Sequence, residues 1–417
     1  MELEPRAYEK IIQLITKGVT IPNPLTLDIG DEVDIDRISG RGVTIYPGCR
    51  IYGDKTVISS GVRIGAEGPV TIDNCQLGGG VELKGGYFAK SVFLEKANMG
   101  LGAHVREGCV LEEEANGAHC VGLKQTILFP FVTLGSLINF CDCLMAGGTS
   151  RKDHSEVGSS YIHFNFTPDG DKTTPSLIGD VPRGVMLNQP LIFLGGQGGM
   201  VGPLRIGYGN VVAAGSILRH DVSEGNKMII GKTHQGLVID VTPRSYKNIL
   251  HVVENNIRYL ANLVALEQWY VQVRRLFFCS QDFGDLLYEG LLDTLSVAKK
   301  ERTKRLAAMA DKMPDSLERY TTQGQAAAGK RELHEKIEEV CALFLGPLGG
   351  EAGIELRDRF LAAFLNHKEK QHKGYIEVIQ SLPDDISRQG VRWLTQIVDT
   401  LCEKGAALVP NLGLFKE

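Results

Sequence analysis

The sequence predicts a left-handed parallel β-helix built from hexapeptide repeats, followed by an α-helical domain. Three observations predict this mainly-β-plus-α architecture. Of the 49 glycines, 37 lie at or before position 240. In that first part, aliphatic residues recur every six positions, and after it they change to helical spacing. We place an N-terminal cap helix at 1–24, the β-helix at 25–241 and the helical domain at 242–417.

The six-residue period is unbroken near the end of the first part. Aliphatic side chains follow one another there at intervals of six: Leu194, Met200, Ile206, Val212 and Leu218. A helix repeats near 3.6 residues and a strand near 2, so neither alone explains the spacing. A short strand followed by a tight corner does explain it. Each six-residue unit then forms one side of a triangular coil whose aliphatic side chains point inward.

A glycine-rich antiparallel sandwich is the alternative architecture for this part of the chain. It predicts alternation with a period of two and Asn-Gly or Asp-Gly hairpin turns. Those signals are sparse here, so the coil is favoured. Interruptions of the register at 72–95 and 145–190 indicate loops that leave the coil.

Helical patterns lie at both ends of the chain. Residues 1–17 place four aliphatic side chains on a helical face, and we expect this helix to cover the strand edges at the end of the coil: Ile11, Ile12, Leu14 and Ile15. The second part shows helical stretches at 249–269, 281–312, 330–345, 354–380 and 384–405. Their apolar stripes indicate a helix-bundle core. The charged run from Lys299 to Arg302 indicates a solvated face.

Composition excludes several classes of partner. The chain carries 45 Lys and Arg against 50 Asp and Glu, so its charge gives no reason to expect nucleic acid. No apolar run reaches the roughly 18 residues of a membrane span, and the N-terminus lacks the layout of a signal peptide. The nine cysteines include no CxxC pair. We therefore expect a cytoplasmic protein with reduced thiols and no structural metal.

Four stretches carry a resemblance to a known family. They are REGCVLEEEANGAHCVGLKQTILF, LGSLINFCDC, VGSSYIHFNFTPDGDK and IGYGNVVAAGSILRHDV, between Arg106 and Lys232. This region, about a third of the chain, resembles the acetyltransferase half of the bifunctional bacterial UDP-N-acetylglucosamine pyrophosphorylases. Those hexapeptide-repeat enzymes acetylate glucosamine 1-phosphate from acetyl-CoA. The resemblance implies a homotrimer with sites between adjacent coils.

The resemblance implies roles for particular residues. Arg106 and Lys124 fall where the family holds the sugar phosphate, and a guanidinium fork beside an ammonium suits that anion. Asn165 falls on a sugar-contacting asparagine, and Lys172 falls on a basic residue near the acceptor. On the coenzyme side, Ala214 matches the small residue beside the pantetheine of acetyl-CoA. Lys232 stands near a family arginine that meets the nucleotide phosphates.

The sequence departs from the family at the catalytic position. Ser136 stands where the family has its catalytic histidine, and Asn139 replaces a tyrosine three residues later; we expect both to belong to the substrate-binding site. A neutral imidazole can accept the proton of an attacking amine near pH 7, whereas a serine cannot. His154 and His163 lie in the matched region, and we consider both as substitute bases. We expect no pyrophosphorylase activity, because residues 1–40 contain no strand, Gly-rich loop and helix of the nucleotide-binding kind.

Three functions are compatible with these patterns. The first, which we favour, is an acyltransferase that acts on an amino-sugar phosphate or a UDP-sugar, with acetyl-CoA as donor. The second is a sugar-nucleotide-binding or scaffold protein that has lost the catalytic histidine. The third is a purely structural coil, which the retained spacing of Arg106 and Lys124 disfavours.

Overall fold

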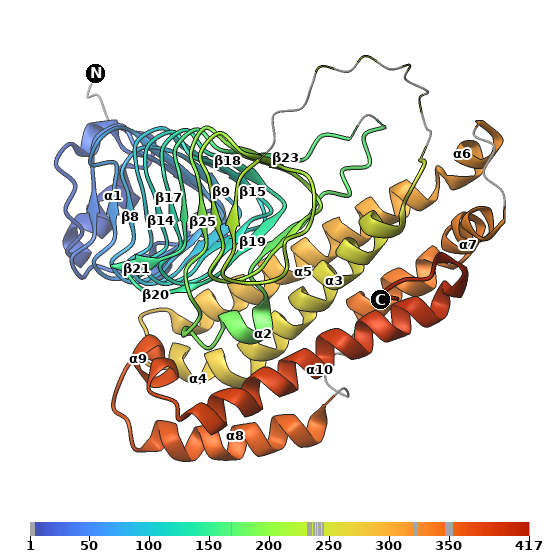
Figure 1. Cartoon of the computed structure of the whole chain (residues 1–417). Coiled ribbons are helices and arrows are strands. Elements are labelled where there is room, and N and C mark those ends of the chain that lie inside the picture. The colour runs from blue at the N-terminus through green and yellow to red at the C-terminus, as the bar shows by residue number, and fades with distance from the viewer. Residues whose placement is uncertain are drawn as a thin grey trace.

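The computed structural model describes residues 5–416 apart from 168, 232–235, 237, 239, 241–242, 244–245, 320–323 and 347–352. Three parallel sheets wrap around a common core to form a three-sided coil, and helices pack along one side of it (Figure 1). The predicted parallel β-helix followed by a helical region is confirmed. We call the sheets I, II and III, in the order in which the chain visits them within a turn.

Each sheet is assembled from one short strand per turn of the coil. Sheet I contains ten strands: β1 (Asp28–Ile29), β3 (Arg50–Tyr52), β6 (Val70–Asp73), β9 (Gly86–Ala89), β12 (Ala103–Val105), β15 (Gly122–Lys124), β18 (Asn139–Cys141), β23 (Ile162–Phe164), β26 (Gly199–Val201) and β29 (Ile217–Leu218). Sheet II contains eight: β4 (Val57–Ile58), β7 (Gln76–Leu77), β10 (Ser91–Phe93), β13 (Cys109–Leu111), β16 (Ile127–Leu128), β19 (Cys143–Met145), β24 (Ser176–Ile178) and β27 (Arg205–Ile206). Sheet III contains ten: β2 (Thr44–Ile45), β5 (Arg63–Ile64), β8 (Glu82–Leu83), β11 (Asn98–Met99), β14 (Asn116–Gly117), β17 (Thr133–Leu134), β22 (Glu156–Val157), β25 (Phe193–Leu194), β28 (Val211–Val212) and β30 (Met228–Ile229).

The residues of the six-residue period form the inner wall of the coil. Leu194 lies on β25, Met200 on β26 and Ile206 on β27, so successive members belong to successive sheets. All five members of the series are at most 5% exposed. Successive turns therefore stack aliphatic side chains into one continuous core.

The two predicted excursions from the coil have different outcomes. Residues 72–95 stay within it, which corrects the expectation of a loop there. Ile72 pairs in register with Phe88, so this turn is only sixteen residues long and the shorter turn displaces the pattern. Within 145–190, three segments leave the coil between strands that remain in it: an antiparallel hairpin of β20 (Gly148–Ser150) and β21 (Asp153–His154), a loop after β23, and the short helix α2 (Val181–Gly184).

Helix α1 (Tyr8–Lys17) lies at the N-terminal end of the coil (Figure 1). Ile11 and Leu14 are buried in the core, whereas Ile12 and Ile15 are 45% and 42% exposed. The Lys10 ammonium donates to the main-chain oxygens of Gly30, Asp31 and Val33, which fastens the helix to the first turn. Short 3₁₀ turns follow at Pro24–Thr26 and Ile35–Arg37.

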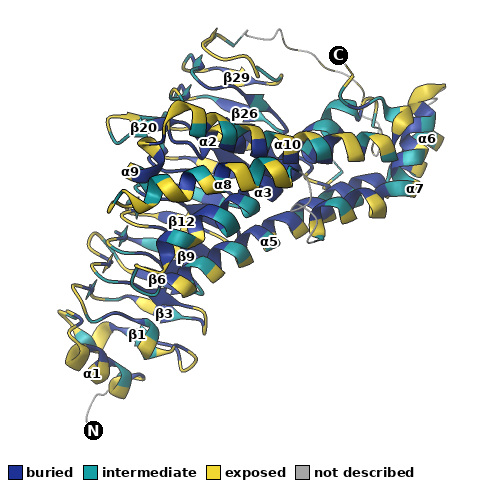
Figure 2. Cartoon of the chain, turned by 90° about the horizontal axis from the view of Figure 1, so that it is seen from below, coloured by how far each residue is buried: buried dark blue, intermediate teal, exposed yellow. Residues whose placement is uncertain are grey.

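The second part of the chain is helical, as predicted. Its elements are α3 (Leu250–Trp269), a π-helical turn (Tyr270–Arg274), α4 (Arg275–Phe278), α5 (Gly284–Ala310), α6 (Met313–Arg319), α7 (Gln325–Leu345), α8 (Ile354–Glu369), α9 (Tyr375–Gln380), α10 (Asp384–Leu408) and a 3₁₀ turn (Pro410–Leu412). The predicted stretch 354–380 is two helices, because residues 370–374 do not continue α8. Helices α3 and α5 run beside the coil with one face buried (Figure 2).

The helices cover the outer face of sheet II. The outward residue of nearly every strand in this sheet is apolar, and these residues pair in one ladder from strand to strand: Val57, Gln76, Val92, Val110, Ile127, Leu144, Leu177 and Arg205. The equivalent ladder of sheet III is largely polar, with Arg63, Glu82, Asn98 and Asn116 on successive strands. The face of the coil that binds the helices is therefore the one whose strands are apolar on both sides.

Buried ion pairs join the helices to the coil. Arg274, in the π-helical turn, lies 2.6 Å from the Glu113 carboxylate, and both side chains are at most 7% exposed. Arg302 of α5 lies 2.9 Å from Asp142 of the coil, again with both side chains almost fully buried. This corrects the expectation of a solvated face at 299–302. Lys299 and Arg302 are three residues apart on a helix, so both point to the packed side of α5.

Candidate functional site

A hollow of about 390 Å³ lies on the outer face of sheet I. His104, Gly122 and Asn139 pair in register on three successive strands of that sheet. Gly122 has no side chain, so the space between His104 and Asn139 is open. Arg106 lines the same hollow, as does Cys120 at its other side. The structure thus brings two predicted site residues, Arg106 and Asn139, to one place.

Arg106 and Lys124 lie on adjacent turns at the corner between sheets I and II. Arg106 directly follows β12, and its main-chain N–H donates to the oxygen of Leu123, the residue before Lys124. Neighbouring strands of a sheet are about 4.8 Å apart, so the two cations leave the coil one above the other. Arg106 is exposed, and among the described residues no carboxylate forms an ion pair with it.

Glu107 forms an ion pair with Lys124 at this corner and so offsets part of its positive charge. The Lys124 ammonium lies 2.7 Å from its carboxylate, and the two side chains are 29% and 41% exposed. Burial acts to raise the pKa of Glu107, but the hydrogen bond from Lys124 and the nearby positive charges outweigh it and lower that pKa. An incoming anion therefore meets an Arg106 guanidinium that contacts the Cys141 thiol but no described carboxylate, and an ammonium that already has a carboxylate partner.

Ser136 lies at the opposite edge of sheet I, at the corner between sheets III and I. Its hydroxyl oxygen is 2.8 Å from Nδ1 of His119, which occupies the same corner one turn earlier. Asn139, three residues after Ser136, begins β18 and is exposed. The position of the family's catalytic histidine is thus held by a serine that contacts an imidazole from the neighbouring turn.

Asn165 and Lys172 belong to the loop that leaves the coil after β23. Asn165 is half-buried and Lys172 is exposed. The helical region holds this loop at several points. The Tyr246 hydroxyl donates to the Asp171 carboxylate, and Asn256 donates to the Thr173 oxygen across 3.1 Å. The loop is thereby fixed beside the corner that carries Lys124, because Thr174 also contacts Asp142, whose N–H bonds to the Lys124 oxygen.

The two candidate histidines lie away from the hollow. His163 is 1% exposed, faces the interior of the coil and lies 2.8 Å from the Ser176 hydroxyl, so we leave it out of the proposed site. His154 belongs to the hairpin at the corner between sheets II and III, where its Nδ1 lies 2.9 Å from the Arg151 oxygen. Within this chain, that corner is not an edge of sheet I, and we leave His154 out as well.

Ala214 and Lys232 are the two residues that the resemblance places beside acetyl-CoA. Ala214 is exposed at the corner between sheets III and I, the same corner as Ser136. The next residue, Gly215, has φ +73°, and a Cβ there would meet nothing within 4 Å, so the space around it is open. Lys232 lies outside the described residues.

Sequence reasoning missed His119 and His104. His119 lies in the matched region one turn before Ser136, whereas His104 lies two residues before that region and two turns before Asn139. The resemblance indicated only His154 and His163 as substitute bases. One turn of the coil is seventeen or eighteen residues, and His119 precedes Ser136 by seventeen. This spacing could have predicted that the two residues are neighbours. Sequence reasoning also missed Tyr246 and Asn256, whose link to the loop spans more than seventy residues.

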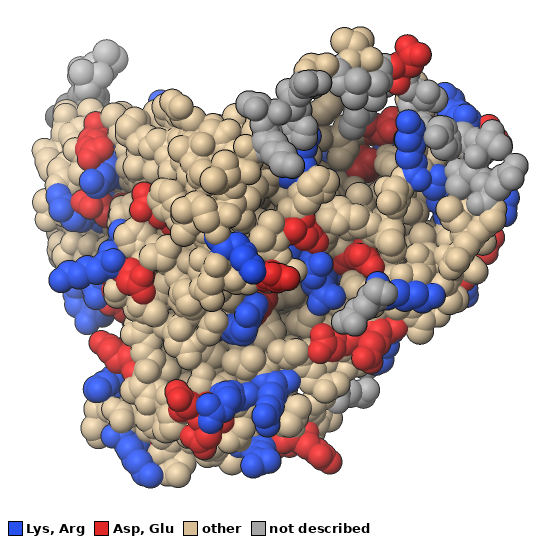
Figure 3. Space-filling model, in the orientation of Figure 1, with Lys and Arg blue, Asp and Glu red and all other residues tan. Residues whose placement is uncertain are grey.

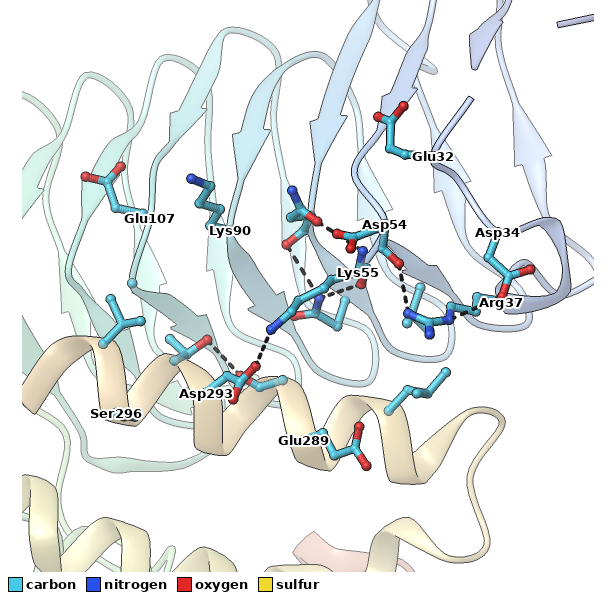
Figure 4. A pocket seen from close by; sticks show the side chains of 18 of the residues that line it. Glu32, Asp34, Arg37, Asp54, Lys55, Lys90, Glu107, Glu289, Asp293 and Ser296 are labelled. Atoms are coloured by element: carbon cyan, nitrogen blue, oxygen red, sulfur yellow. Dashed lines mark hydrogen bonds and ion pairs between the residues drawn. The ribbon is translucent and has the colours of Figure 1, made fainter. Parts of the chain in front are cut away.

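A larger cavity, about 900 Å³, lies between the coil and α5 (Figure 4). Lys55 reaches across it from the coil to Asp293 of α5, 2.7 Å away. Its charged lining contains six carboxylates and four cations: Glu32, Asp34, Asp54, Glu107, Glu289 and Asp293 against Arg37, Lys55, Lys90 and Lys300. This excess of negative charge does not suit a phosphate.

Two general features bear on the class of site. Among the described residues, no group of three or more His, Cys, Asp or Glu side chains converges in a way that could hold a metal ion. None of the helices in the described part of the chain combines the length and the apolar composition of a membrane span.

The fold and this site define a parallel solenoid protein with a hollow on the outer face of one sheet. No protein-family model matches the chain. It is 30% identical to the bifunctional protein GlmU of Thermotoga maritima over 220 residues, which is 52% of this chain and 44% of that protein. The matches to GlmU of Fervidobacterium nodosum (29% over 235 residues; 56% and 46%) and of Synechococcus elongatus (27% over 213 residues; 51% and 42%) are similar.

The chain thus spans less than half the length of these curated relatives. The similarity confirms the predicted resemblance to hexapeptide-repeat transferases of the GlmU kind. The parallel solenoid is consistent with their acetyltransferase half.

Proposed function

We propose that this protein transfers an acetyl group from acetyl-CoA to the amino group of an amino-sugar phosphate or UDP-sugar. The observation that carries the proposal is the hollow on sheet I, where Arg106 and Asn139 meet. Lys124 extends from the next turn of the same edge. A planar guanidinium with an ammonium beside it suits a phosphate, and an exposed amide suits sugar hydroxyls.

The donor and acceptor would approach from the two edges of sheet I. The phosphate would bind at the corner with Arg106 and Lys124, close to the loop that presents Asn165 and Lys172. The acyl donor would lie along the opposite corner, where Ala214 has only a methyl side chain and the space around Gly215 is open. The acetyl thioester and the amine would then meet near Ser136 and Asn139, at the edge of sheet I along which the donor lies.

We also propose assembly as a homotrimer in the cytoplasm. The outer face of sheet I carries several exposed large apolar side chains: Tyr87, Ile162, Phe164 and Ile217, which are 38–46% exposed. Figure 3 shows that the upper part of the coil carries few charged side chains compared with its N-terminal end and the helices. A flat, weakly charged side of a three-sided coil can pack against another copy about a threefold axis. All nine cysteines are free thiols, as in reduced proteins.

A second candidate function is sugar-nucleotide binding without catalysis. The observation that favours it is the replacement of the family's histidine by Ser136 and of its tyrosine by Asn139. In that case the anion site at Arg106 and Lys124 would be occupied, but acetyl-CoA would not be consumed.

Calorimetry with glucosamine 1-phosphate and with UDP-N-acetylglucosamine tests the anion site. Arg106→Ala removes a charge-assisted hydrogen bond, and we expect binding to weaken by about 1.5–3 kcal/mol. Glu107→Gln has the opposite sign, because it frees the Lys124 ammonium from its present partner. We expect that variant to bind the phosphate more tightly than the parent protein.

Arg50→Ala is the matched control, because Arg50 is an exposed arginine on the same sheet, three turns away at β3. We expect it to bind as the parent does. Equal affinity of parent and Arg106→Ala would remove the sugar-phosphate site. Release of thiol from acetyl-CoA with glucosamine 1-phosphate then separates the two functions, since a binding protein gives no turnover.

A further inference from the structure

The contact between His119 and Ser136 lies at the edge of the proposed site. The two residues stack on successive turns at the corner between sheets III and I, and the Leu137 N–H donates to the His119 oxygen. Cys120 and Asn139, their near neighbours in the chain, both line the hollow of sheet I. An imidazole therefore lies beside the family's catalytic position, although the residue at that position is a serine.

We propose that His119 is the general base of the acetyl transfer and that Ser136 orients its ring. This inference rests on the proposed function. The separation of 2.8 Å between Ser136 Oγ and His119 Nδ1 is that of a normal hydrogen bond. With the proton on Nδ1 donated to the serine oxygen, the lone pair of Nε2 is free for the substrate. A hydrogen bond to one imidazole nitrogen fixes the state of the other in this way.

The proton and electron balance of the step is simple. The substrate amine attacks the carbonyl carbon of the acetyl thioester, a C–N bond forms, and the C–S bond breaks. The nitrogen loses one proton to Nε2 of His119. The imidazolium then returns that proton to the leaving thiolate as coenzyme A departs. No oxidant, reductant or metal is needed.

The other histidines near sheet I are less suited to this role. His104 lines the hollow, but its ring lies against Tyr87 with the centroids 5.1 Å apart, and among the described residues no polar group holds either nitrogen. His163 is enclosed in the core, and His154 belongs to a different corner. His119 combines exposure at the hollow's edge with a polar contact that sets its ring.

The test measures thiol release from acetyl-CoA with glucosamine 1-phosphate, using the full chain. His119→Gln should lower kcat on the order of a hundredfold to ten-thousandfold, the usual loss when a general base is removed. The dissociation constant for glucosamine 1-phosphate, measured by calorimetry, should stay within about twofold of the parent value. Added imidazole should restore part of the turnover of His119→Ala.

Ser136 acts through His119 and not on the substrate. Its variants must therefore be compared by a measurement that a purely structural change would leave unaltered, which is the effect on kcat relative to KM. Ser136→Ala should lower kcat less than His119→Gln does, with KM unchanged, whereas Ser136→Thr keeps the hydroxyl and should retain the parent turnover. His220→Gln, which removes an exposed histidine distant from this corner, is the matched control.

Three results would overturn the inference. One is a His119→Gln variant with the turnover of an active parent. The second is loss of turnover in His104→Gln but not in His119→Gln. The third is acetylation of Ser136, found by peptide mass analysis, which would make the serine a nucleophile. A parent protein that binds the sugar phosphate but releases no thiol is distinct from all three: it removes the transferase function, and the role of His119 with it.

Discussion

The imidazole of His163 is enclosed in the coil, where it packs against Phe140 and hydrogen-bonds with Ser176. Burial lowers the pKa of His163 to about 3, because a charged ring would lose its hydration there. In the unfolded chain the pKa of a histidine is about 6.5. Below that pH the unfolded state binds a proton that the folded state excludes. The contribution of the neutral His163 to the free energy of unfolding is therefore complete above pH 6.5. It is lost progressively as the pH falls toward 3.

This linkage gives a prediction for His163→Gln. Between pH 6.5 and 4.5 the free energy of unfolding of the parent should fall by about 1.4 kcal/mol per pH unit more than that of the variant. Urea unfolding at several pH values measures both slopes. His220→Gln, a change at an exposed histidine, should leave the slope of the parent in place. If the free energies of unfolding of the parent and of His163→Gln change with pH in parallel, then the folded state accepts the proton at His163 and the prediction is wrong.

How much of the site the sequence could predict depends on the length of a turn. Arg106 and Lys124 are eighteen residues apart, one turn, so their stacking at one corner followed from the repeat. The contact of His119 with Ser136 also spans one turn, but it was not predicted because the resemblance implies no role for the position that His119 occupies. His163 alternates with exposed neighbours on β23, and strand alternation alone could have placed it inward.

At the scale of elements, the loop after β23 depends on helices that lie far away in the sequence. Tyr246 and Asn256 bond to Asp171 and Thr173, and Lys312 donates to the Asp169 oxygen across 2.5 Å. No local pattern in the loop could predict this support, because these three partners come from the helical region. The helices thereby hold the segment that carries Asn165 and Lys172.

Tyr246→Phe tests this dependence. It deletes a hydrogen bond to a carboxylate, which contributes about 1.5–3 kcal/mol when buried. We expect faster hydrogen–deuterium exchange in peptides covering 165–174 and weaker binding of glucosamine 1-phosphate. Tyr52→Phe is the matched control, because Tyr52 donates to Asp28 across 2.6 Å at the other end of the coil. If both variants exchange alike in 165–174, the helices do not hold the loop.

At the scale of the whole molecule, the sequence contains the signal for which side of the coil is covered. The six-residue period predicted the inward residues, because one aliphatic residue per strand suffices for the core. In sheet II the outward neighbour is apolar too, as in Val92-Phe93, Val110-Leu111 and Ile127-Leu128. A second apolar series at the same period indicates a face buried on both sides. The sequence of the coil does not predict which helices cover sheet II. Helices α3 and α5 contact the coil through pairs such as Arg302 and Asp142, which lie far apart in the sequence.

Val110→Glu tests whether this face unites the two parts of the molecule. Val110 is buried on the outer side of β13, against α5, and an unpaired carboxylate there costs several kcal/mol unless the helices separate from the coil. Because the coil has its own core, we expect it to survive while the helical region detaches, so that thermal unfolding of the variant shows two transitions. Asn116→Glu places the same charge on the next strand of the same turn, on the polar face of sheet III, and should unfold as the parent does. A single transition at the parent temperature in Val110→Glu would mean that the face of sheet II does not hold the helices.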